Sequence, residues 1–551
     1  MGEQVIPIRH QPRLPVDRLI VREPPDPESV PMDVVFVGGG PAGLAGAIQL
    51  AKLVRADNEQ GGGIGEIEIG VLEKAETLGE HCLSGAVINP APFHALFPEL
   101  TLESLPFRGP VQEERVYLLT ESGSLRIPTP PTMRNHGNQI ASICEVVRWL
   151  GEQAEVLGVN LFTGFPAESL LVEGESVIGV RTTPSGLNRD GQPGAGYNPP
   201  TDITARVVAL AEGTRGSLAQ AYYQWQQIRS PNPQIYALGV KEIWETKQPL
   251  DAIVHTMNWP LPKDAFGGSF MYPLEPNVVA LGLVVGLDYR DAHLDVHVLL
   301  QQLKQHPLFR PYLEGGELVE WGAKTIPEGG YHALPERLAG NGCVVLGDAA
   351  GFVEVASLKG IHYAVQSGIL AAHAIFDALK QGDVSASALA AYDRAVRGSV
   401  IVKDLHARRN MRLAFKDGFY AGGLKAGLMS ISGGRLFGGR IAMEADADAP
   451  RRTDTPTPSA SGPLTISKLD AVFKSGNTTR DDIPSHLVVG EDVPAEVAEL
   501  YVHMCPAGVY ERAGDRLVVN APNCIDCKAT DVLGPRWTPR EGGSGPKYRR
   551  M

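Results

Sequence analysis

The sequence has little cysteine and no long apolar run, and both absences narrow the class of protein. Six of its 551 residues are cysteine. That is too few for a disulfide framework in a chain of this length, so we expect a reducing compartment. No stretch of 18 apolar residues occurs, so no segment is expected to span a bilayer. The first 31 residues lack an apolar h-region and mix acids with bases, which argues against a signal or transit peptide.

The chain also lacks an excess of positive charge. Its formal net charge is −13, which argues against nucleic acid as the main partner. Hydrophobic residues make up 43% and charged residues 21%, as in an ordinary folded protein. A chain of 551 residues exceeds what one hydrophobic core supports, so two or three domains are expected.

The stretch 34–53, VVFVGGGPAGLAGAIQLAKL, passes from a strand-like apolar run through three glycines into a helical pattern. Its glycines at 38, 40 and 43 fit G-x-G-x-x-G. In that motif they allow a tight turn, close approach of a pyrophosphate, and packing of helix on strand. The helix N-terminus then points N–H groups at the phosphates. The expected cofactor-binding residues of this turn are Gly38, Gly39, Gly40, Pro41, Ala42 and Gly43.

Three later segments complete the expected dinucleotide site. A second apolar run ends at Glu73, an acid able to bind ribose hydroxyls, and the polar insert 56–65 explains its distance from the fingerprint. Gly347-Asp348 follows another apolar run, where the carboxylate is suited to ribitol hydroxyls, and Gly213 follows the run 207–211. No second G-x-G-x-x-G unit with strand and helix occurs. We therefore expect FAD without a separate nicotinamide domain, reduced by another protein or a transient donor.

Cysteines gather only near the end of the sequence. Cys505 opens CPAGVY, and Cys524 and Cys527 form CIDC. Thiolates two residues apart can hold one metal centre, with a third supplied by the Cys-Pro turn. A zinc site of three cysteines and His503 is the alternative. We favour an iron–sulfur cluster because Cys-Pro is common at cluster ligands.

Several short segments together resemble the electron transfer flavoprotein–ubiquinone oxidoreductase family. They are HCLSGA, NHGNQI, AEGTRGSL, ALGVKEIWE, FGGSFMYP, SLKGIH, AFKDGFYAGG, CPAGVYE, CIDC and EGGSGPKY. The resemblance implies FAD, one 4Fe-4S cluster, ubiquinone as acceptor and reduced electron transfer flavoprotein as donor. It also implies monotopic attachment to an inner membrane, which we expect to be a bacterial cytoplasmic membrane. No general acid or base can be named from the sequence.

The resemblance, together with the alternation of strand-like and helical patterns along the sequence, predicts an α/β and α+β architecture. A Rossmann-like FAD-binding domain of the glutathione-reductase type is interrupted by a quinone-binding domain with an antiparallel sheet, and a ferredoxin-like cluster domain follows. The expected boundaries are an N-terminal arm (1–31), the discontinuous FAD-binding domain (32–221 and 334–408), the quinone-binding domain (222–333), a membrane-surface helical segment (409–448), a linker (449–463) and the iron–sulfur domain (464–551).

The site residues of the family are matched only in part in this sequence. Gly267 and Gly268, which follow Phe266, fall on the family's quinone-contact glycines. The family's cysteine pattern is C…CxxCxxC, and here Thr530 stands at the fourth position. Three outcomes stay open: a 3Fe-4S cluster, a 4Fe-4S cluster with oxygen from Thr530, Asp531, Asp526 or water, or a labile or lost cluster. We favour a cluster held by three thiolates.

The segment Arg409–Ile431 could place an aromatic and aliphatic stripe on one helical face, or pack it on the core. The resemblance favours a membrane surface. The stripe consists of Phe415, Phe419, Tyr420, Leu424, Leu428 and Met429. Two other functions compete: a FAD-dependent hydroxylase or polyprenyl reductase that uses NADPH, and a non-enzymatic flavin-bearing membrane scaffold. The hydroxylase and the polyprenyl reductase do not require the cysteine-rich domain, and in the scaffold the cluster would have decayed.

Overall fold

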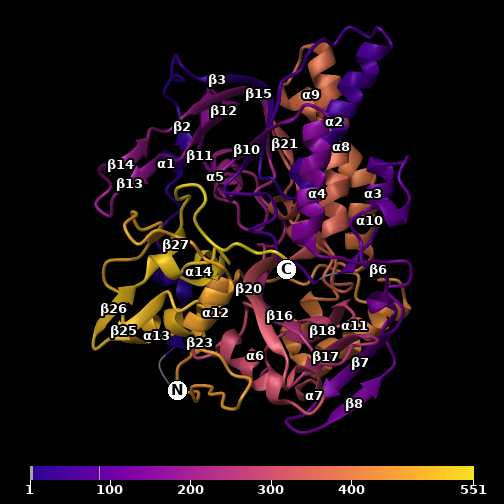
Figure 1. Ribbon diagram of the computed structural model, residues 1–551, viewed down its shortest axis with the longest axis vertical. Coiled ribbons are helices and arrows are strands. Elements are labelled where there is room, and N and C mark those ends of the chain that lie inside the picture. The colour runs from indigo at the N-terminus through magenta and orange to yellow at the C-terminus, as the bar shows by residue number, and fades with distance from the viewer. Residues whose placement is uncertain (1–3, 86) are drawn as a thin grey trace.

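The computed structural model describes residues 4–85 and 87–551. Two large sheets lie one above the other in Figure 1, and the C-terminal domain, in yellow, lies against both at the side. The first sheet carries the glycine fingerprint, the second is antiparallel over most of its width, and the cysteines lie in the yellow domain. The predicted three-part architecture is therefore confirmed.

The first sheet has nine strands, and its centre is parallel. Runs such as VVFV (34–37) are buried on both faces, as expected for parallel strands covered on each side. Gly368 lets helix α8 (Ile361–Gln381) approach α2 (Pro41–Glu59), because a Cβ there would lie 2.3 Å from the oxygen of Ala42. The strand order is β10 (Asn160–Thr163), β4 (Ile69–Glu73), β3 (Val30–Val37), β15 (Asp202–Leu210), β12 (Ser176–Thr182), β11 (Ala167–Glu173) and β2 (Ile20–Val21), with β22 (Cys343–Val345) beside β15 and β21 (Ala339–Gly340) beside β22.

The second sheet has seven strands. Its order is β20 (Glu317–Pro327), β16 (Tyr236–Glu245), β19 (Val278–Gly286), β18 (Gly267–Glu275), β17 (Ile253–Asn258), β7 (Glu114–Leu119) and β8 (Ser124–Ile127). Strands β7 and β8 form a hairpin. It lies within the stretch 32–221 that the sequence assigned to the first domain, yet β7 pairs in parallel with β17 of the second sheet. Which sheet a hairpin joins depends on its pairing with strands that are distant in the sequence.

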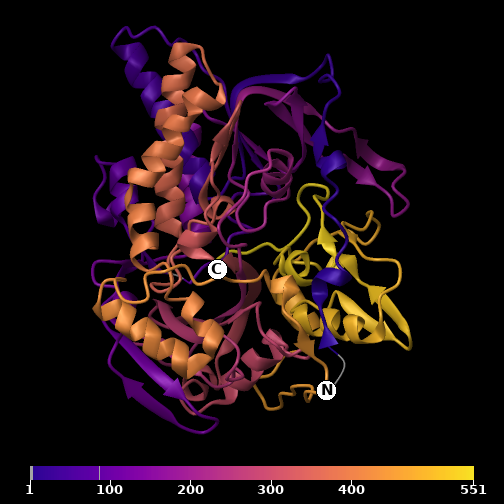
Figure 2. The ribbon, with the colours of Figure 1, turned by 180° about the vertical axis from the view of Figure 1, so that it is seen from behind.

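The C-terminal domain is built of short elements. They are α12 (Lys468–Lys474), β24 (Leu487–Val488), α13 (Ala495–Met504), β25 (Tyr510–Ala513), β26 (Arg516–Val519), α14 (Ala529–Leu533) and β27 (Arg536–Trp537). The N-terminal arm, indigo in Figure 2, runs along this domain. Its strand β1 (Gln4–Val5) pairs with β23 (Arg451–Arg452), and Gln11 donates to the oxygen of Asp531 at 3.0 Å.

The remaining helices cover the sheets and the loops between them. They are α1 (Val16–Leu19), α3 (Ala91–Leu96), α4 (Ile143–Val156), α5 (Ser217–Trp225), α6 (Val296–Gln305), α7 (Arg310–Leu313), α9 (Ala386–Gly398) and α10 (Val400–Ala407). In the part of the chain that the structure describes, no helix is both long and apolar enough to cross a membrane.

The segment predicted as one amphipathic helix is divided in two. A 3-10 turn (Leu413–Asp417) ends at Gly418, whose φ is +93°, and α11 (Phe419–Ile431) follows. Phe415 in the turn packs on Phe266, and Met429 is buried, so the predicted single stripe is wrong for these two side chains. The exposed apolar residues of α11 and the loop after it are Tyr420, Leu424, Leu428, Ile431, Leu436 and Phe437.

Candidate cofactor sites

A cavity of about 380 Å³ opens at the carboxyl ends of β3, β4, β15 and β22, where ligands bind in open α/β sheets. Most of the predicted FAD-binding residues line it: Gly38, Gly40, Pro41, Ala42, Glu73, Gly213, Gly347 and Asp348. Gly39, Gly43, Gly267, Gly268 and the three cysteines lie outside its described lining. The structure thus brings together residues that are up to 310 positions apart in the sequence.

The fingerprint glycines divide into two kinds by what a side chain would meet. A Cβ on Gly38, whose φ is +116°, would lie 2.3 Å from the oxygen of Ala211, and one on Gly43 would lie 2.1 Å from the oxygen of Gly38. Both are needed for strand, turn and helix to pack. A Cβ on Gly40 would meet no atom within 4 Å and would point into open space at the cavity. That open space beside the helix N-terminus fits a pyrophosphate.

The two predicted carboxylates differ in how the protein holds them. Glu73 accepts the backbone N–H of Gly39 at 3.0 Å and that of Ala75 at 2.8 Å, which fixes its carboxylate at the cavity wall. Asp348 is approached by the hydroxyl of Thr214 at 3.5 Å. Burial raises the pKa of Asp348 to about 6. A buried carboxylate with so little donor support fits a ligand that brings hydroxyl groups.

Lysines and histidines line the same cavity, and the sequence analysis did not identify them as site residues. The lysines are Lys74, Lys241, Lys324, Lys359 and Lys528, of which Lys241 and Lys528 are buried, and the histidines are His81, His255 and His362. Burial lowers the pKa of Lys241 and of Lys359 to about 8. His255 is buried, and its Nε2 has no hydrogen-bond partner among the described residues. These positions come from separate strands and loops, so no local pattern in the sequence could have indicated them.

The two predicted quinone glycines open strand β18. A Cβ on Gly267 would lie 2.1 Å from the oxygen of Val284, and one on Gly268 would lie 2.5 Å from the oxygen of Thr256. Their lack of side chains therefore serves close pairing within the sheet. Phe266, directly before them, lies with its ring centre 4.8 Å from that of Phe415, so this end of β18 adjoins the segment that leads into α11.

The three predicted cysteine ligands are buried free thiols that converge from two loops. Cys505 ends α13, and Cys524 and Cys527 flank a turn before α14. Burial raises the pKa of Cys524 to about 12. Burial, with the nearby Cys505 and Cys524, also raises the pKa of Cys527. Three such thiols fit a metal centre whose positive charge is needed to hold them as thiolates.

The hydroxyl of Thr530, at the fourth ligand position, is already hydrogen bonded. Its Oγ1 lies 2.6 Å from the hydroxyl of Tyr510 and donates to the oxygen of Pro535 at 3.3 Å. Asp531 is engaged as well, because its Oδ2 accepts from Arg215 at 2.9 Å and from Gln220 at 3.1 Å. Neither oxygen is free to replace a thiolate.

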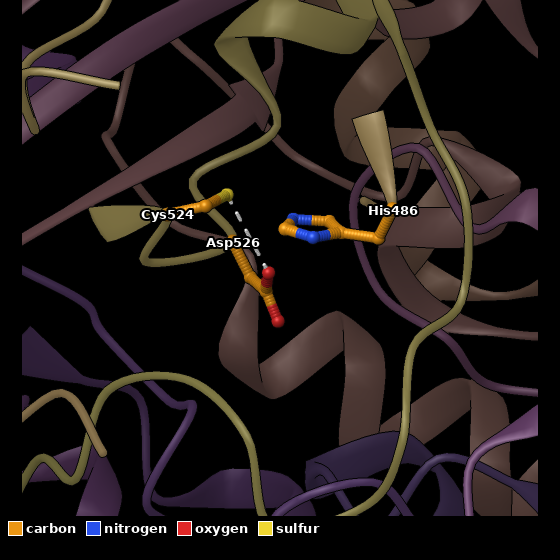
Figure 3. A group of neighbouring side chains, drawn as sticks. All are labelled: His486, Cys524 and Asp526. Atoms are coloured by element: carbon orange, nitrogen blue, oxygen red, sulfur yellow. Dashed lines mark hydrogen bonds between the residues drawn. The ribbon is translucent and has the colours of Figure 1, made fainter. Parts of the chain in front are cut away.

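Asp526, between the two cysteines of CIDC, is the most heavily engaged carboxylate. It accepts from Lys74 at 2.6 Å and from the indole N–H of Trp537 at 2.9 Å, and it forms an ion pair with Arg540 at 3.0 Å. His486 points its ring toward Cys524 and Asp526 (Figure 3), with ligand atoms of the three within 4.8 Å of one another.

His503, the zinc ligand of the alternative prediction, faces carboxylates. Its Nδ1 lies 3.5 Å from Asp295 and its Nε2 lies 3.7 Å from Glu499. The arrangement therefore fits an iron–sulfur cluster on three thiolates better than a zinc site with His503.

Two family models match the chain. The one described as ETF-QO, ubiquinone-binding matches residues 236–326, the centre of the second sheet. The one described as electron transfer flavoprotein-ubiquinone oxidoreductase, 4Fe-4S matches residues 462–549, which contain all three cysteines. The two matches fall on separate parts of the fold that meet at the cavity.

Solved structures share about three quarters of the fold. A geranylgeranyl bacteriochlorophyll reductase-like protein from Thermoplasma acidophilum has a TM-score of 0.56 at 17% identity, covering 74% of this chain and 93% of its own. The flavin-dependent brominase Bmp2 has a TM-score of 0.51 at 16% identity, covering 74% and 94%. At these identities the likeness shows the fold alone.

Curated relatives match nearly end to end, and each is named electron transfer flavoprotein-ubiquinone oxidoreductase, mitochondrial. The protein from Oryza sativa subsp. japonica is 36% identical over 95% of this chain and 94% of its own. Those from Caenorhabditis elegans and Homo sapiens are 37% and 35% identical, covering 95% and 94% of this chain and 92% and 89% of their own. The chain therefore belongs to the electron transfer flavoprotein–ubiquinone oxidoreductase family.

Proposed function

We propose that this chain is a membrane-associated flavoprotein oxidoreductase that takes electrons from reduced electron transfer flavoprotein and delivers them to ubiquinone. One observation carries the proposal. A dinucleotide cradle and a sheet matched by a ubiquinone-binding family model line one cavity, and the domain that carries the three buried thiols contributes Lys528 and Trp537 to its wall, in a chain related to such enzymes over nearly its whole length. The chain thus carries a place for each cofactor and for the acceptor.

FAD supplies one- and two-electron redox chemistry when bound, and an iron–sulfur cluster supplies one-electron steps. The protein's contribution is to bind and orient these groups. Gly38 to Gly43 form the pyrophosphate cradle, Glu73 is placed for the ribose, and Asp348 with Gly213 and Gly347 is placed for the ribitol side. Cys505, Cys524 and Cys527 hold the cluster.

We assign Gly267 and Gly268 to the quinone site. They lie in the segment matched as ubiquinone-binding, and the ring contact between Phe266 and Phe415 links that end of β18 to the segment leading into α11. An insoluble isoprenoid tail requires an acceptor site that opens toward lipid. A direct test is crosslinking with a photoreactive quinone, which should label residues around 266–268 and leave the outer hairpin β7–β8 unlabelled.

We further propose peripheral attachment to the inner membrane through α11. Its exposed side chains include Tyr420 and Leu424, each 68% exposed, and Ile431, 86% exposed. An apolar face of this kind fits the interfacial region of a bilayer. Leu424→Glu should lower binding to phospholipid vesicles roughly tenfold, because it replaces an exposed leucine that would insert into the bilayer with a charged side chain. Leu125→Glu, at a 64% exposed site on β8, is the matched control and should bind vesicles like the unchanged protein.

The function is tested by reducing the purified holoprotein with reduced electron transfer flavoprotein and then adding a short-chain ubiquinone. The flavin absorbance should bleach on the first addition and return on the second. NADPH in place of the protein donor should leave the flavin oxidised. Rapid reduction by NADPH, with none by electron transfer flavoprotein, would instead indicate the FAD-dependent hydroxylase or polyprenyl reductase.

A further inference from the structure

The C-terminal cysteine domain forms part of the wall of the FAD cavity. Lys528, Trp537 and Pro539 of that domain line the cavity together with the glycine cradle of the first domain. Lys528 also directly follows Cys527, one of the three cluster ligands assigned above. We propose that Lys528 binds the anionic part of FAD and thereby couples FAD affinity to the presence of the cluster. This inference deepens the proposed function and rests on it.

Lys528 is a buried lysine at the cavity wall whose charged neighbours already have other partners. It is 6% exposed, and its Nζ lies 3.0 Å from the ring centre of Trp537. Within the described residues it makes no direct hydrogen bond or ion pair. The three carboxylates nearby are engaged elsewhere: Asp526 pairs with Lys74 and Arg540, Asp531 pairs with Arg215, and Glu212 accepts the backbone N–H groups of Leu218 and Ala219.

A buried cation of this kind is costly unless a negative group approaches it. The face of the Trp537 ring attracts the cation and lowers the free-energy cost of burying it, but does not cancel that cost. The pyrophosphate of FAD brings negative charge into the same cavity. Lys528 therefore has the position and the chemistry of a cofactor ligand that comes from outside the FAD-binding domain.

The position of Lys528 depends on the shape of the loop 524–528. Asp526 and Lys528 have φ of +56° and +70°, a conformation that side-chain-bearing residues adopt only when their surroundings hold it. The backbone N–H of Thr325 on β20 donates to the oxygen of Cys527 at 2.9 Å, and Arg540 donates to the oxygen of Cys524 at 2.9 Å. The loop is thus held where three domains meet.

A cluster on Cys524 and Cys527 would clamp both ends of this turn and so fix the residue that follows it. Without the cluster this turn is free to move, so Lys528 is no longer held in position to bind FAD. Because coupling between two binding sites is reciprocal, bound FAD should in turn slow loss of the cluster. The two cofactor sites are thereby linked through a single side chain.

The test compares FAD dissociation constants, measured by flavin fluorescence, for cluster-loaded and cluster-free protein, with iron and sulfide content determined for each sample. In the unchanged chain we expect cluster removal to weaken FAD binding roughly tenfold, the size of one hydrogen bond to a charged group. Lys528→Gln should bind FAD about tenfold more weakly in the cluster-loaded form, and cluster removal should weaken it little further. Lys528→Arg should restore most of the affinity.

Lys547→Gln is the matched control, because Lys547 also links the C-terminal domain to the first domain, through Glu76, but lies outside the cavity. It should leave FAD affinity within about twofold. Equal FAD affinity of the unchanged protein with and without cluster would overturn the proposal, as would unchanged affinity in Lys528→Gln. A protein that passes this test yet takes no electrons from electron transfer flavoprotein would refute the proposed function and leave the coupling intact.

Discussion

The glycine cradle and the cysteine site are built in different ways. The cradle is formed by backbone: Gly38 and Gly43 allow the close approach of strand, turn and helix, and Gly40 leaves space at the cavity. The cysteine site depends on side chains from distant segments, such as Lys74 and Arg540 around Asp526. A backbone site is specified locally by a short motif, whereas the side-chain site depends on neighbours from other segments, such as Tyr510, which is hydrogen bonded to Thr530.

The strongest way to break the cradle is to fill the space at Gly40. Gly40→Val should fold, because a Cβ there meets no atom within 4 Å, but its side chain would occupy the pyrophosphate position. We expect FAD affinity to fall by at least about 100-fold, through loss of several backbone hydrogen bonds to phosphate. Equilibrium dialysis with FAD measures the change. Gly398→Val, at another open position, should retain the cofactor. Retention by both variants would contradict the assigned cradle.

The free-energy cost of burying the charged Asp348 carboxylate can be measured from the pH dependence of stability. Burial raises its pKa from 3.8 to about 6, so the folded protein binds this proton more tightly than the unfolded chain. Stability from this group is therefore present below pH 4 and lost as the pH rises through 6. At pH 7.5 the buried charge costs FAD-free protein about 3 kcal/mol.

Asp348→Asn should remove that cost. In FAD-free protein at pH 7.5, its melting temperature should exceed that of the unchanged chain, and the two should converge near pH 4. Thermal unfolding followed by circular dichroism across this range measures the difference. The same variant should bind FAD more weakly, since an amide is a poorer acceptor for ribitol hydroxyls. A constant difference at all pH values would show that Asp348 is not the titrating group.

The smallest effect is expected from a substitution in the cysteine site. Thr530→Cys restores a fourth thiol in a buried position of similar volume. We expect slower loss of iron in air and a rise toward four irons per chain, because each iron of the cluster then has a protein ligand. Iron and sulfide analysis with electron paramagnetic resonance measures both. Cys343→Ser, far from the site on β22, should leave iron content unchanged. Four stable irons in the unchanged chain would mean that water or another group completes the site.

Elements specified by nearby residues could be predicted from the sequence. The strand, turn and helix of the glycine fingerprint follow from local periodicity and turn residues. Elements specified by distant contacts could not. The pairing of β7 with β17 is one example, and the interruption of the predicted amphipathic helix at Gly418 is another. The lysines that line the cavity could not be predicted either, because nothing in their flanking sequence indicates that they lie at a cavity wall.

Strand β20 has a consequence for how this molecule moves. It belongs to the second sheet, yet Lys324 and Thr325 line the FAD cavity and the N–H of Thr325 holds the carbonyl of Cys527. A shift of this strand would change the separations among flavin, cluster and acceptor at the same time. Movements of the cavity wall and of the loop that carries Cys527 are therefore expected to be coupled through this strand.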